Sequence, residues 1–223
     1  VTFKEGGTNF TNSLLVGTDS TGTLSSADGN TGVGVGVLGA LTTGDNNVAV
    51  GLNALDLNTT GLENVAVGKG ALLANTTGNS NTAVGCGSLD ANTTADQNSA
   101  FGYESLGANT TGTQNVAVGA SALDANTTAS QNTAVGVCAL TTNITGCHNA
   151  AVGYGSLLFN TTGNRNSAFG REAMYANTTG SENTGIGNAA LTRNTTGTVS
   201  TAVGREALCG QTTGDNNTGV GYQ

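Results

Sequence analysis

The chain repeats itself every 17 residues from Ser13 to its last residue, without an insertion or a deletion. The repeats follow the pattern N-[TVS]-A-V-G-x-x-[AS]-L-x-x-N-T-T-G-x-x. Because every repeat has the same length, each is expected to form the same structural unit. This feature constrains the fold more than any other. The twelve complete repeats begin at Ser13, Asn30, Asn47, Asn64, Asn81, Asn98, Asn115, Asn132, Asn149, Asn166, Asn183 and Ser200, and a partial one begins at Asn217.

Five of the 17 positions are tightly restricted in residue type. The third position is Ala or Gly except at Leu15, and the fourth is always Val, Phe or Ile. The ninth is Leu or Met except at Thr21, and the fifteenth is Gly or Ala throughout. The fifth position is Gly in every repeat: Gly17, Gly34, Gly51, Gly68, Gly85, Gly102, Gly119, Gly136, Gly153, Gly170, Gly187, Gly204 and Gly221. We interpret these as turn glycines at a corner that needs positive φ or close backbone approach, and the fifteenth position as a second tight bend. The sixth, seventh, tenth, eleventh, sixteenth and seventeenth positions vary freely.

This pattern predicts an all-β fold, a parallel β-solenoid (β-roll) of 17-residue coils. Helical repeats are longer, and Gly and β-branched residues disfavour helices. In a solenoid each coil lies about 4.8 Å above the last, so every residue stacks on its counterpart. The chain contains no proline, which would delete a ladder hydrogen bond. We expect a single solenoid over residues 13–223, with residues 1–12 an irregular lead-in or the cut end of a preceding repeat.

The strand segment has two faces that both favour close packing. In the repeat beginning at Asn132, Thr133 and Val135 share one face and Ala134 points to the other. One face is expected to pack inside the coil against Leu140, and the other then needs a partner. A trimer around a common axis supplies that partner, because closed oligomers hide such faces. A slim monomeric solenoid is the alternative.

Composition narrows the function classes. The 223 residues include 36 glycines, 4% aromatic and 9% charged residues, with a formal net charge of −8. The six basic residues form no patch, which argues against nucleic-acid binding through phosphate contacts. No signal peptide and no apolar run of membrane-spanning length is evident. The chain begins at Val1 and ends a few residues into a repeat, so we expect a segment of a longer polypeptide.

The phrases NTAVG and NSAFG, followed by the small, Leu and Gly positions, resemble the NSVAIG-type repeats of trimeric autotransporter adhesin heads. The longer N-T-A-V-G-x-x-A-L-x-x-N-T-T-G form is also similar to repeats in tail-fibre-like proteins of phages and aquatic bacteria. The resemblance covers Asn30 to Gln223 well and Ser13 to Gly29 weakly. It implies a trimeric, left-handed parallel β-roll in a surface fibre.

The twelfth position carries the main candidate for covalent modification. It is Asn in nine consecutive repeats, each time within an N-x-T sequon: Asn58, Asn75, Asn92, Asn109, Asn126, Asn143, Asn160, Asn177 and Asn194. Asn9 and Asn216 make two further sequons outside this row. Two interpretations stay open for the row, a line of N-glycans on a secreted protein and a turn in which stacked Asn and Thr side chains hydrogen-bond. The first-position asparagines, Asn30 to Asn183, are not sequons, and we expect them to form a buried or half-buried ladder at a turn.

Other motifs indicate no chemistry. Residues 34–39 match G-x-G-x-x-G but lack the following helix and the βαβ unit of a dinucleotide site. Cys86, Cys138, Cys147 and Cys209 stand at four different positions of the repeat. They have no metal-ligand spacing, although Cys138 and Cys147 share a repeat and would bridge if the coil is flat there. His148 has no evident catalytic partner, and Asp90, Asp124 and Glu104 are expected to be solvated. Asp45 with Asn46 and Asp215 with Asn216 offer oxygen atoms to a cation, but no calcium-binding repeat is present.

We therefore expect a non-enzymatic structural protein without cofactors or metals. Its expected role is the shaft of an extracellular fibre or filament, adhesin-like or tail-fibre-like, located at a cell or virion surface. Its expected partners are further copies of itself, covalently attached glycans and a cell-surface or carbohydrate receptor. The alternative is an ice- or carbohydrate-binding β-solenoid that uses its Thr and Asn ladders.

Overall fold

The computed structural model describes residues 3–7, 10–17 and 25–223, and the side chains of residues 13–17 and 25–223. The chain divides into two compact units, Val1–Thr113 and Gln114–Gln223. Both are built from the same 17-residue coil, and no helix occurs among the described residues. The prediction of an all-β parallel solenoid of 17-residue coils is confirmed.

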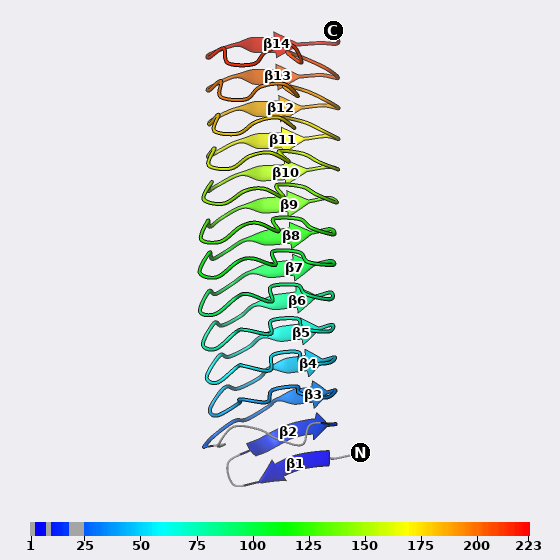
Figure 1. Ribbon diagram of the computed structural model, residues 1–223, viewed down its shortest axis with the longest axis vertical. Coiled ribbons are helices and arrows are strands. Elements are labelled where there is room, and N and C mark those ends of the chain that lie inside the picture. Colours follow the sequence, from blue (N-terminus) through cyan, green and yellow to red (C-terminus); the bar gives the residue numbers. More distant parts are fainter. Residues whose placement is uncertain (1–2, 8–9, 18–24) are drawn as a thin grey trace. The chain divides into compact units, whose positions relative to one another are not determined.

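The first unit contains seven strands. β2 (Phe10–Val16) is followed by five three-residue strands, β3 (Thr31–Val33), β4 (Val48–Val50), β5 (Val65–Val67), β6 (Thr82–Val84) and β7 (Ser99–Phe101). Each pairs in parallel with the next, position on position, as Val48 with Val65 and Val50 with Val67. Figure 1 shows these strands stacked one above another, with the rest of each coil looping back between them.

The N-terminal edge of this sheet is closed by an antiparallel strand. β1 (Phe3–Gly7) pairs with β2, with Phe3 opposite Val16 and Gly7 opposite Phe10. The sequence predicts an irregular lead-in over residues 1–12, whereas the described residues there form β1 and the beginning of β2. This segment is a regular strand because β1 hydrogen-bonds to the backbone N–H and C=O groups at the edge of the first coil, which would otherwise be unpaired.

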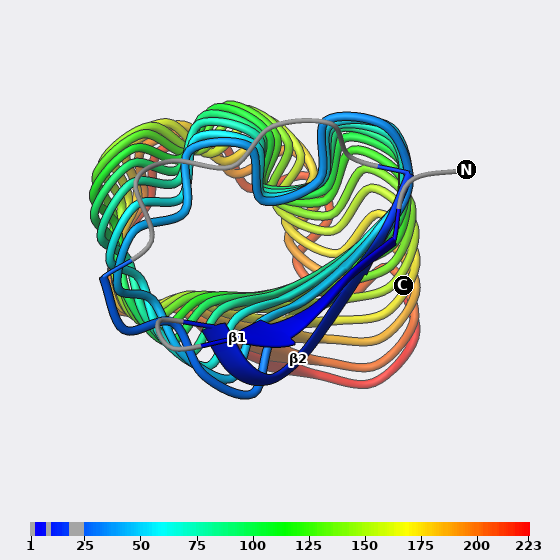
Figure 2. The same ribbon diagram turned by 90° about the horizontal axis from the view of Figure 1, so that it is seen from below.

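The second unit repeats the arrangement with seven strands. They are β8 (Val116–Val118), β9 (Thr133–Val135), β10 (Ala150–Val152), β11 (Ser167–Phe169), β12 (Thr184–Ile186), β13 (Thr201–Val203) and β14 (Thr218–Val220). All neighbouring pairs are parallel and in register. The view along the stack shows the strands of a unit on one side of the coil and loops on the others (Figure 2).

The interior of each coil is filled from five positions of the repeat. The third-position Ala or Gly, the small eighth-position residue and the ninth-position Leu or Met are buried, as at Ala134, Ala139 and Leu140. The two asparagine positions complete the interior. Ala134 therefore faces inward together with Leu140, while Thr133 and Val135 on the same strand are part-exposed.

Candidate functional site

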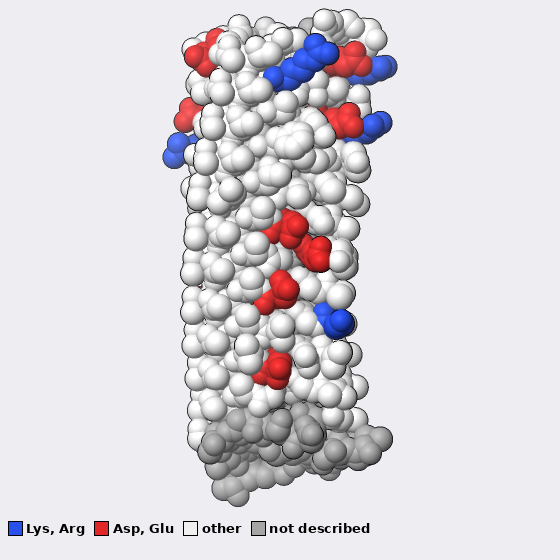
Figure 3. Space-filling view, in the orientation of Figure 1, with Lys and Arg blue, Asp and Glu red and all other residues white. Residues whose placement is uncertain are grey.

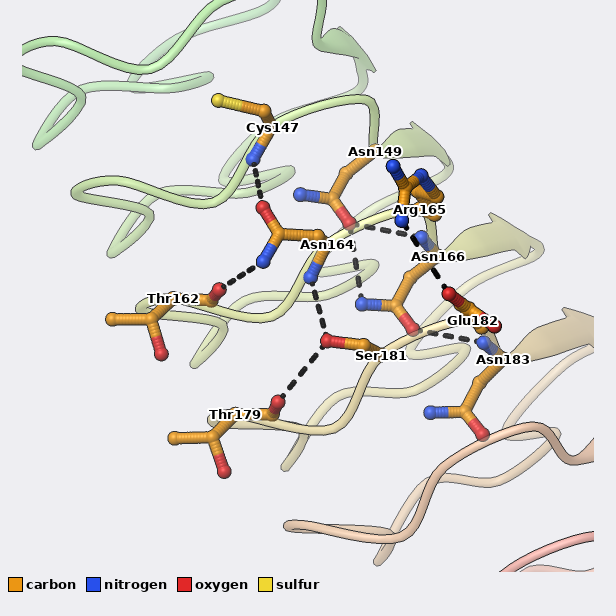
Figure 4. Close-up of polar contacts among 10 residues, drawn as sticks. All are labelled: Cys147, Asn149, Thr162, Asn164, Arg165, Asn166, Thr179, Ser181, Glu182 and Asn183. Carbon is orange, nitrogen blue, oxygen red and sulfur yellow. Dashed lines mark hydrogen bonds and ion pairs between the residues drawn. The ribbon is translucent and has the colours of Figure 1, made fainter.

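The first-position asparagines form a continuous buried ladder within each unit. Asn149 is typical: its Nδ2 donates to Asn132 Oδ1 (3.2 Å) and to the Gly163 carbonyl (2.8 Å). Its Oδ1 accepts from the backbone N–H of Asn166 (3.0 Å) and from Asn166 Nδ2 (3.2 Å). Both amide hydrogens and both lone pairs of the carbonyl oxygen are therefore used. The expected ladder is confirmed, and Figure 4 shows three of its members, Asn149, Asn166 and Asn183.

The twelfth-position asparagines form a second ladder. Asn160 Nδ2 donates to Asn143 Oδ1 (2.8 Å) and to the Gly163 carbonyl (3.0 Å), and Asn160 Oδ1 accepts from Asn177 Nδ2 (2.8 Å). The fifteenth-position carbonyl thus receives a hydrogen bond from each ladder, at Gly163 from Asn149 and Asn160. This shared acceptor links the first residue of a coil to the turn near its end.

The second ladder decides where the sequon asparagines lie. Asn58, Asn75, Asn92, Asn109, Asn126, Asn143, Asn160, Asn177 and Asn194 have no exposed surface at all. Nδ2 is the atom that would carry a glycan, and in this fold it lies inside the coil and donates to protein oxygens. A sugar at these positions is incompatible with the coil. The contacts are those of the structural interpretation, and they replace the row of N-glycans as our account of the twelfth position.

The two sequons outside the row fall elsewhere. Asn216 is exposed, so its side chain is open to solvent. Asn9 lies outside the described residues. The structure therefore leaves Asn216 as the one described sequon whose amide nitrogen a glycan can reach.

In a few repeats another residue stands in place of a ladder asparagine. Its side chain is either polar and still forms hydrogen bonds, or apolar. Gln211 replaces the twelfth Asn, and its Nε2 reaches the Gly214 carbonyl (2.7 Å) and Asn194 Oδ1 (3.4 Å). Ser200 replaces the first Asn, and its Oγ accepts the backbone N–H of Asn217 (3.2 Å). Leu41 at the twelfth position is buried and apolar. Among the side chains that the structure describes, no buried nitrogen or oxygen lacks a hydrogen-bond partner.

The two threonines after the twelfth Asn have different environments. The thirteenth-position hydroxyl donates along the stack to the carbonyl of its counterpart, as Thr161 Oγ1 to Thr178 O (3.1 Å). The fourteenth-position Thr is exposed, as at Thr162 and Thr179. Of these two rows, the fourteenth therefore carries the more exposed threonines.

The sixteenth position carries a further ladder that sequence reasoning missed. Its side chain accepts the backbone N–H of the residue one coil earlier, as Asn164 Oδ1 from Cys147 (2.8 Å) and Ser181 Oγ from Asn164 (3.0 Å) (Figure 4). Asp96 and Asp215 act in the same way. Eleven of the twelve residues there are Asp, Asn, Ser, Thr or Cys, and Leu62 is the exception. The position varies in identity but not in its ability to accept a hydrogen bond, and that was the available signal.

The fifth-position glycines meet both conditions predicted for them. At Gly136, φ is 138°, and an added Cβ would lie 2.6 Å from the Gly153 carbonyl oxygen. The corner glycines from Gly34 to Gly85 and from Gly119 to Gly204 each pack against the next one in this way, so no larger residue fits there.

The fifteenth position, predicted as a second tight bend, is small for another reason. None of its residues has positive φ. A Cβ on Gly163 would instead approach the amide nitrogen of Asn177 (3.0 Å) and the neighbouring carbonyl of Gly180. The asparagine ladder limits side-chain size there, and Ala129 fits with almost no exposure.

Left-handed backbone occurs at three further positions of the coil. The seventh, ninth and seventeenth residues have φ near +55°, as at Cys138 (57°), Leu140 (52°) and His148 (60°). Non-glycine residues pay a conformational cost there, so surrounding contacts must impose the geometry. The seventh and seventeenth positions accept many side chains and the ninth is Leu or Met except at Thr21, so none of the three is restricted to glycine.

The outer face of the sheet is apolar and part-exposed. The fourth-position side chains point outward, with Val118 36%, Phe169 42% and Ile186 42% exposed. The second-position residues beside them are Val, Thr, Ser or Ala in the second unit. The outward side of the strand is thus the Val and Thr side, because Ala faces the interior.

Charged groups are sparse and lie outside the two asparagine ladders. Charged side chains are few and scattered on the face shown in Figure 3. Burial raises the pKa of the Asp56 carboxyl above its ordinary value. Burial also raises the pKa of Asp90, as does the charge of Glu104, while backbone hydrogen bonds at Ala91 and Asp90 lower it less. Both carboxyls are therefore less well solvated than a surface carboxyl. For Asp90 this differs from the solvated position that the sequence predicts.

The residues that suggested metal or redox chemistry are not brought together. All four cysteines have free thiols, so Cys138 and Cys147 form no disulfide although they share a coil. Among the described residues no group of three or more His, Cys, Asp or Glu side chains is placed to hold a metal ion. The same part of the chain contains no helix long and apolar enough to cross a membrane.

Comparisons with family models, with curated proteins and with solved structures find no match to this chain. The functional argument therefore rests on the coil itself.

Proposed function

We propose that this chain is a non-catalytic structural element, the shaft of an extracellular fibre or filament of the adhesin or tail-fibre kind. The observation that carries the proposal is the pair of buried asparagine ladders, which bond coil to coil through most of each unit, the second being interrupted at Leu41. The restricted third, fifth, ninth and fifteenth positions serve stacking, whereas the restricted fourth position faces outward. Such a chain is suited to spanning distance, because each added repeat extends the stack by about 4.8 Å.

The shaft is proposed to be a homotrimer at a cell or virion surface. Closed rotational assemblies hide faces like the apolar outer side of the sheet. The surface that it presents carries no sugar on the nine twelfth-position asparagines, because these are buried. A receptor, on a cell surface or of carbohydrate, would be contacted by the exposed variable positions.

Immunogold labelling of intact cells or particles that produce the chain tests this function. Antibodies against the exposed loops are expected to decorate filaments on the outer surface before any permeabilisation. Label that appears only after permeabilisation would contradict the extracellular shaft.

A second candidate is an ice- or carbohydrate-binding solenoid, favoured by the exposed fourteenth-position threonines at one per coil. The thirteenth-position hydroxyls donate to carbonyls along the stack, which leaves a single row rather than a two-row plane. Thermal hysteresis of the purified chain, and its retention on immobilised polysaccharide, distinguish this candidate from the shaft, for which neither is expected.

A further inference from the structure

The sixth position of the repeat carries a distinct run of side chains in the last five repeats. In order along the stack, the row reads Tyr154, Arg171, Asn188, Arg205 and Tyr222. The carbonyl of a sixth-position residue accepts the backbone N–H of the seventh residue one coil later, as Tyr154 O from Glu172 (2.9 Å) and Asn188 O from Glu206 (2.8 Å). These bonds and the in-register strands before them place the five residues in one row, one coil apart.

Each end of this row is a tyrosine whose ring contacts an arginine. Arg171 Cζ lies 6.0 Å from the ring centroid of Tyr154, and Arg205 Cζ lies 5.4 Å from that of Tyr222. The tyrosines are 54% and 70% exposed, and Asn188 between the two arginines is exposed as well. The row therefore presents an aromatic ring at each end and hydrogen-bonding groups between them.

The positive charges of the row are neutralised within their own coils. Arg171 forms an ion pair with Glu172 and Arg205 with Glu206, each at 2.9 Å. A chain of formal net charge −8 whose arginines are paired does not attract a polyanion, so nucleic acids and acidic polysaccharides are poor partners for this row. A guanidinium carries five N–H donors, so pairing with one carboxylate leaves donors for a neutral ligand.

The coil itself does not require these residues. In other repeats of the same length and register, the sixth position holds small or apolar residues, as at Val35, Leu52, Cys86, Ala120 and Val137. Stacking therefore does not explain why tyrosine, arginine and asparagine follow one another at this position in five successive repeats.

A second pair of rings widens the row at its Tyr154 end. Gly155 has no side chain, and the ring of Tyr175 lies 3.5 Å from the place where a Cβ on Gly155 would be. Tyr175 packs edge-on against Phe159, with ring centroids 5.0 Å apart, and Phe159 is 43% exposed. Aromatic surface is thus gathered in two neighbouring coils of a chain with only 4% aromatic residues.

A neutral sugar chain fits these groups. A sugar ring has a face of C–H groups that packs on an aromatic ring, and a rim of hydroxyls that donate and accept hydrogen bonds. The coil spacing of about 4.8 Å is close to the length of one hexopyranose unit, so successive sugars meet successive coils. No step of this fit needs a charge on the ligand.

We propose that the sixth-position row binds a neutral polysaccharide that lies along the stack. Sugar rings pack on Tyr154 and Tyr222, and hydroxyls bond to Arg171, Asn188 and Arg205. The shaft by itself gives no reason for retention on a polysaccharide, so this row adds a binding surface to it.

Native electrophoresis in gels that contain hydroxyethylcellulose, galactomannan or arabinoxylan tests the proposal. We expect the wild type to be retarded by at least one of these polymers, and Tyr154→Ala with Tyr222→Ala to raise the Kd about tenfold or more. Tyr103→Ala is the matched control, because Tyr103 is 55% exposed at the same repeat position but has no arginine there in the coil before or after. We expect the control to bind like the wild type, and all variants to keep the circular dichroism of the wild type.

A wild type that none of the three polymers retards, or an equal loss of binding in Tyr103→Ala, would overturn the proposal. Stronger retardation by alginate, an acidic polymer, than by every neutral one would also overturn it. Retardation lost in Thr162→Ala with Thr179→Ala, but kept in the double tyrosine variant, would assign binding to the exposed threonines instead.

If the double tyrosine variant does not fold, Arg171→Gln with Arg205→Gln decides. Both side chains are more than 60% exposed, so we expect this variant to fold and to bind more weakly than the wild type. Unchanged binding would again contradict the row. Filaments labelled by immunogold, without any retardation in the gels, would leave the shaft standing while this inference fails.

Discussion

At the scale of single residues, stability depends on asparagine amides whose hydrogen bonds run in two directions. Each Asn bonds along the stack to its counterpart and also to a fifteenth-position carbonyl, as Asn160 does to Asn143 and Gly163. Buried amides are stabilising only when their partners are present. One missing member therefore affects the coil on either side.

The variant Asn160→Ala tests this dependence. It removes the acceptor of Asn177 Nδ2 and the donor to Asn143 Oδ1, so we expect a loss of about 1–3 kcal/mol in the free energy of unfolding. Thr162→Ala is the control, since it removes the same sequon but alters an exposed side chain. Urea denaturation of the two variants should separate them clearly, and equal stability would contradict a structural role for Asn160.

A second residue-scale prediction concerns two glycines in one coil. Gly68 has φ 139°, and an added Cβ would lie 2.6 Å from the Gly85 carbonyl carbon, whereas Gly70 (φ 67°) faces open space. We expect Gly68→Ala to cost about 3 kcal/mol or more and Gly70→Ala about 1 kcal/mol. Thermal or chemical unfolding measures both. If the two costs are alike, close packing of the corner glycines is not what restricts the fifth position.

The raised pKa of Asp90 leads to a prediction about pH. A carboxyl whose pKa is higher in the folded than in the unfolded chain disfavours folding while it is ionised. As the pH falls through the folded-state pKa towards the ordinary value of 3.8, this residue's contribution to stability should therefore rise. Asp90→Asn should be more stable than the wild type near neutral pH and should lack this part of the pH dependence. Denaturation midpoints across the acidic range provide the measurement, and a variant less stable at neutral pH would contradict the sign.

At the scale of the element, the sequence predicted those features of the coil that only one residue type can satisfy. The corner glycines, the third-position alanines and the ninth-position leucines were evident because one residue type fits each place. The sixteenth-position acceptor row was missed because Asp, Asn, Ser, Thr and Cys all supply an acceptor. The left-handed backbone at Cys138 or His148 was missed because the stacked neighbours impose it on many side chains.

The candidate site was only half predictable for a related reason. The N-x-T pattern describes both a sequon and a buried ladder, so the twelfth position had two interpretations until its burial was known. The sequence also implied that the strand needs a partner. It did not reveal that Val135, not Ala134, faces outward, because both positions are apolar and small enough for either side.

Register along the stack gives a prediction at this scale. Deletion of residues 132–148 removes one whole coil and lets Asn115 meet Asn149 in the same register. Deletion of Thr128 alone shifts each later position by one and turns outward side chains inward at that junction. We expect the first variant to keep cooperative thermal unfolding and the β-type circular dichroism, and the second to lose stability sharply. Equal tolerance of both deletions would contradict the strict 17-residue period.

At the scale of the whole molecule, few ion pairs contribute to the fold. Three are seen among the described residues, each with an Arg side chain more than 60% exposed, as for Arg165 with Glu182. Exposed pairs of this kind contribute little. Hydrogen-bonded ladders and apolar burial account for the stability of each unit, and the outward strand positions carry no charge.

A density map of the native assembled particle tests the central claim most directly, because it shows chain number, side-chain burial and covalent sugar together. The account predicts several copies around one axis, the outer faces of β8 to β14 in contact, and no sugar density on Asn75 or Asn160. A single chain with that face in solvent, or a glycan on either asparagine, would contradict it.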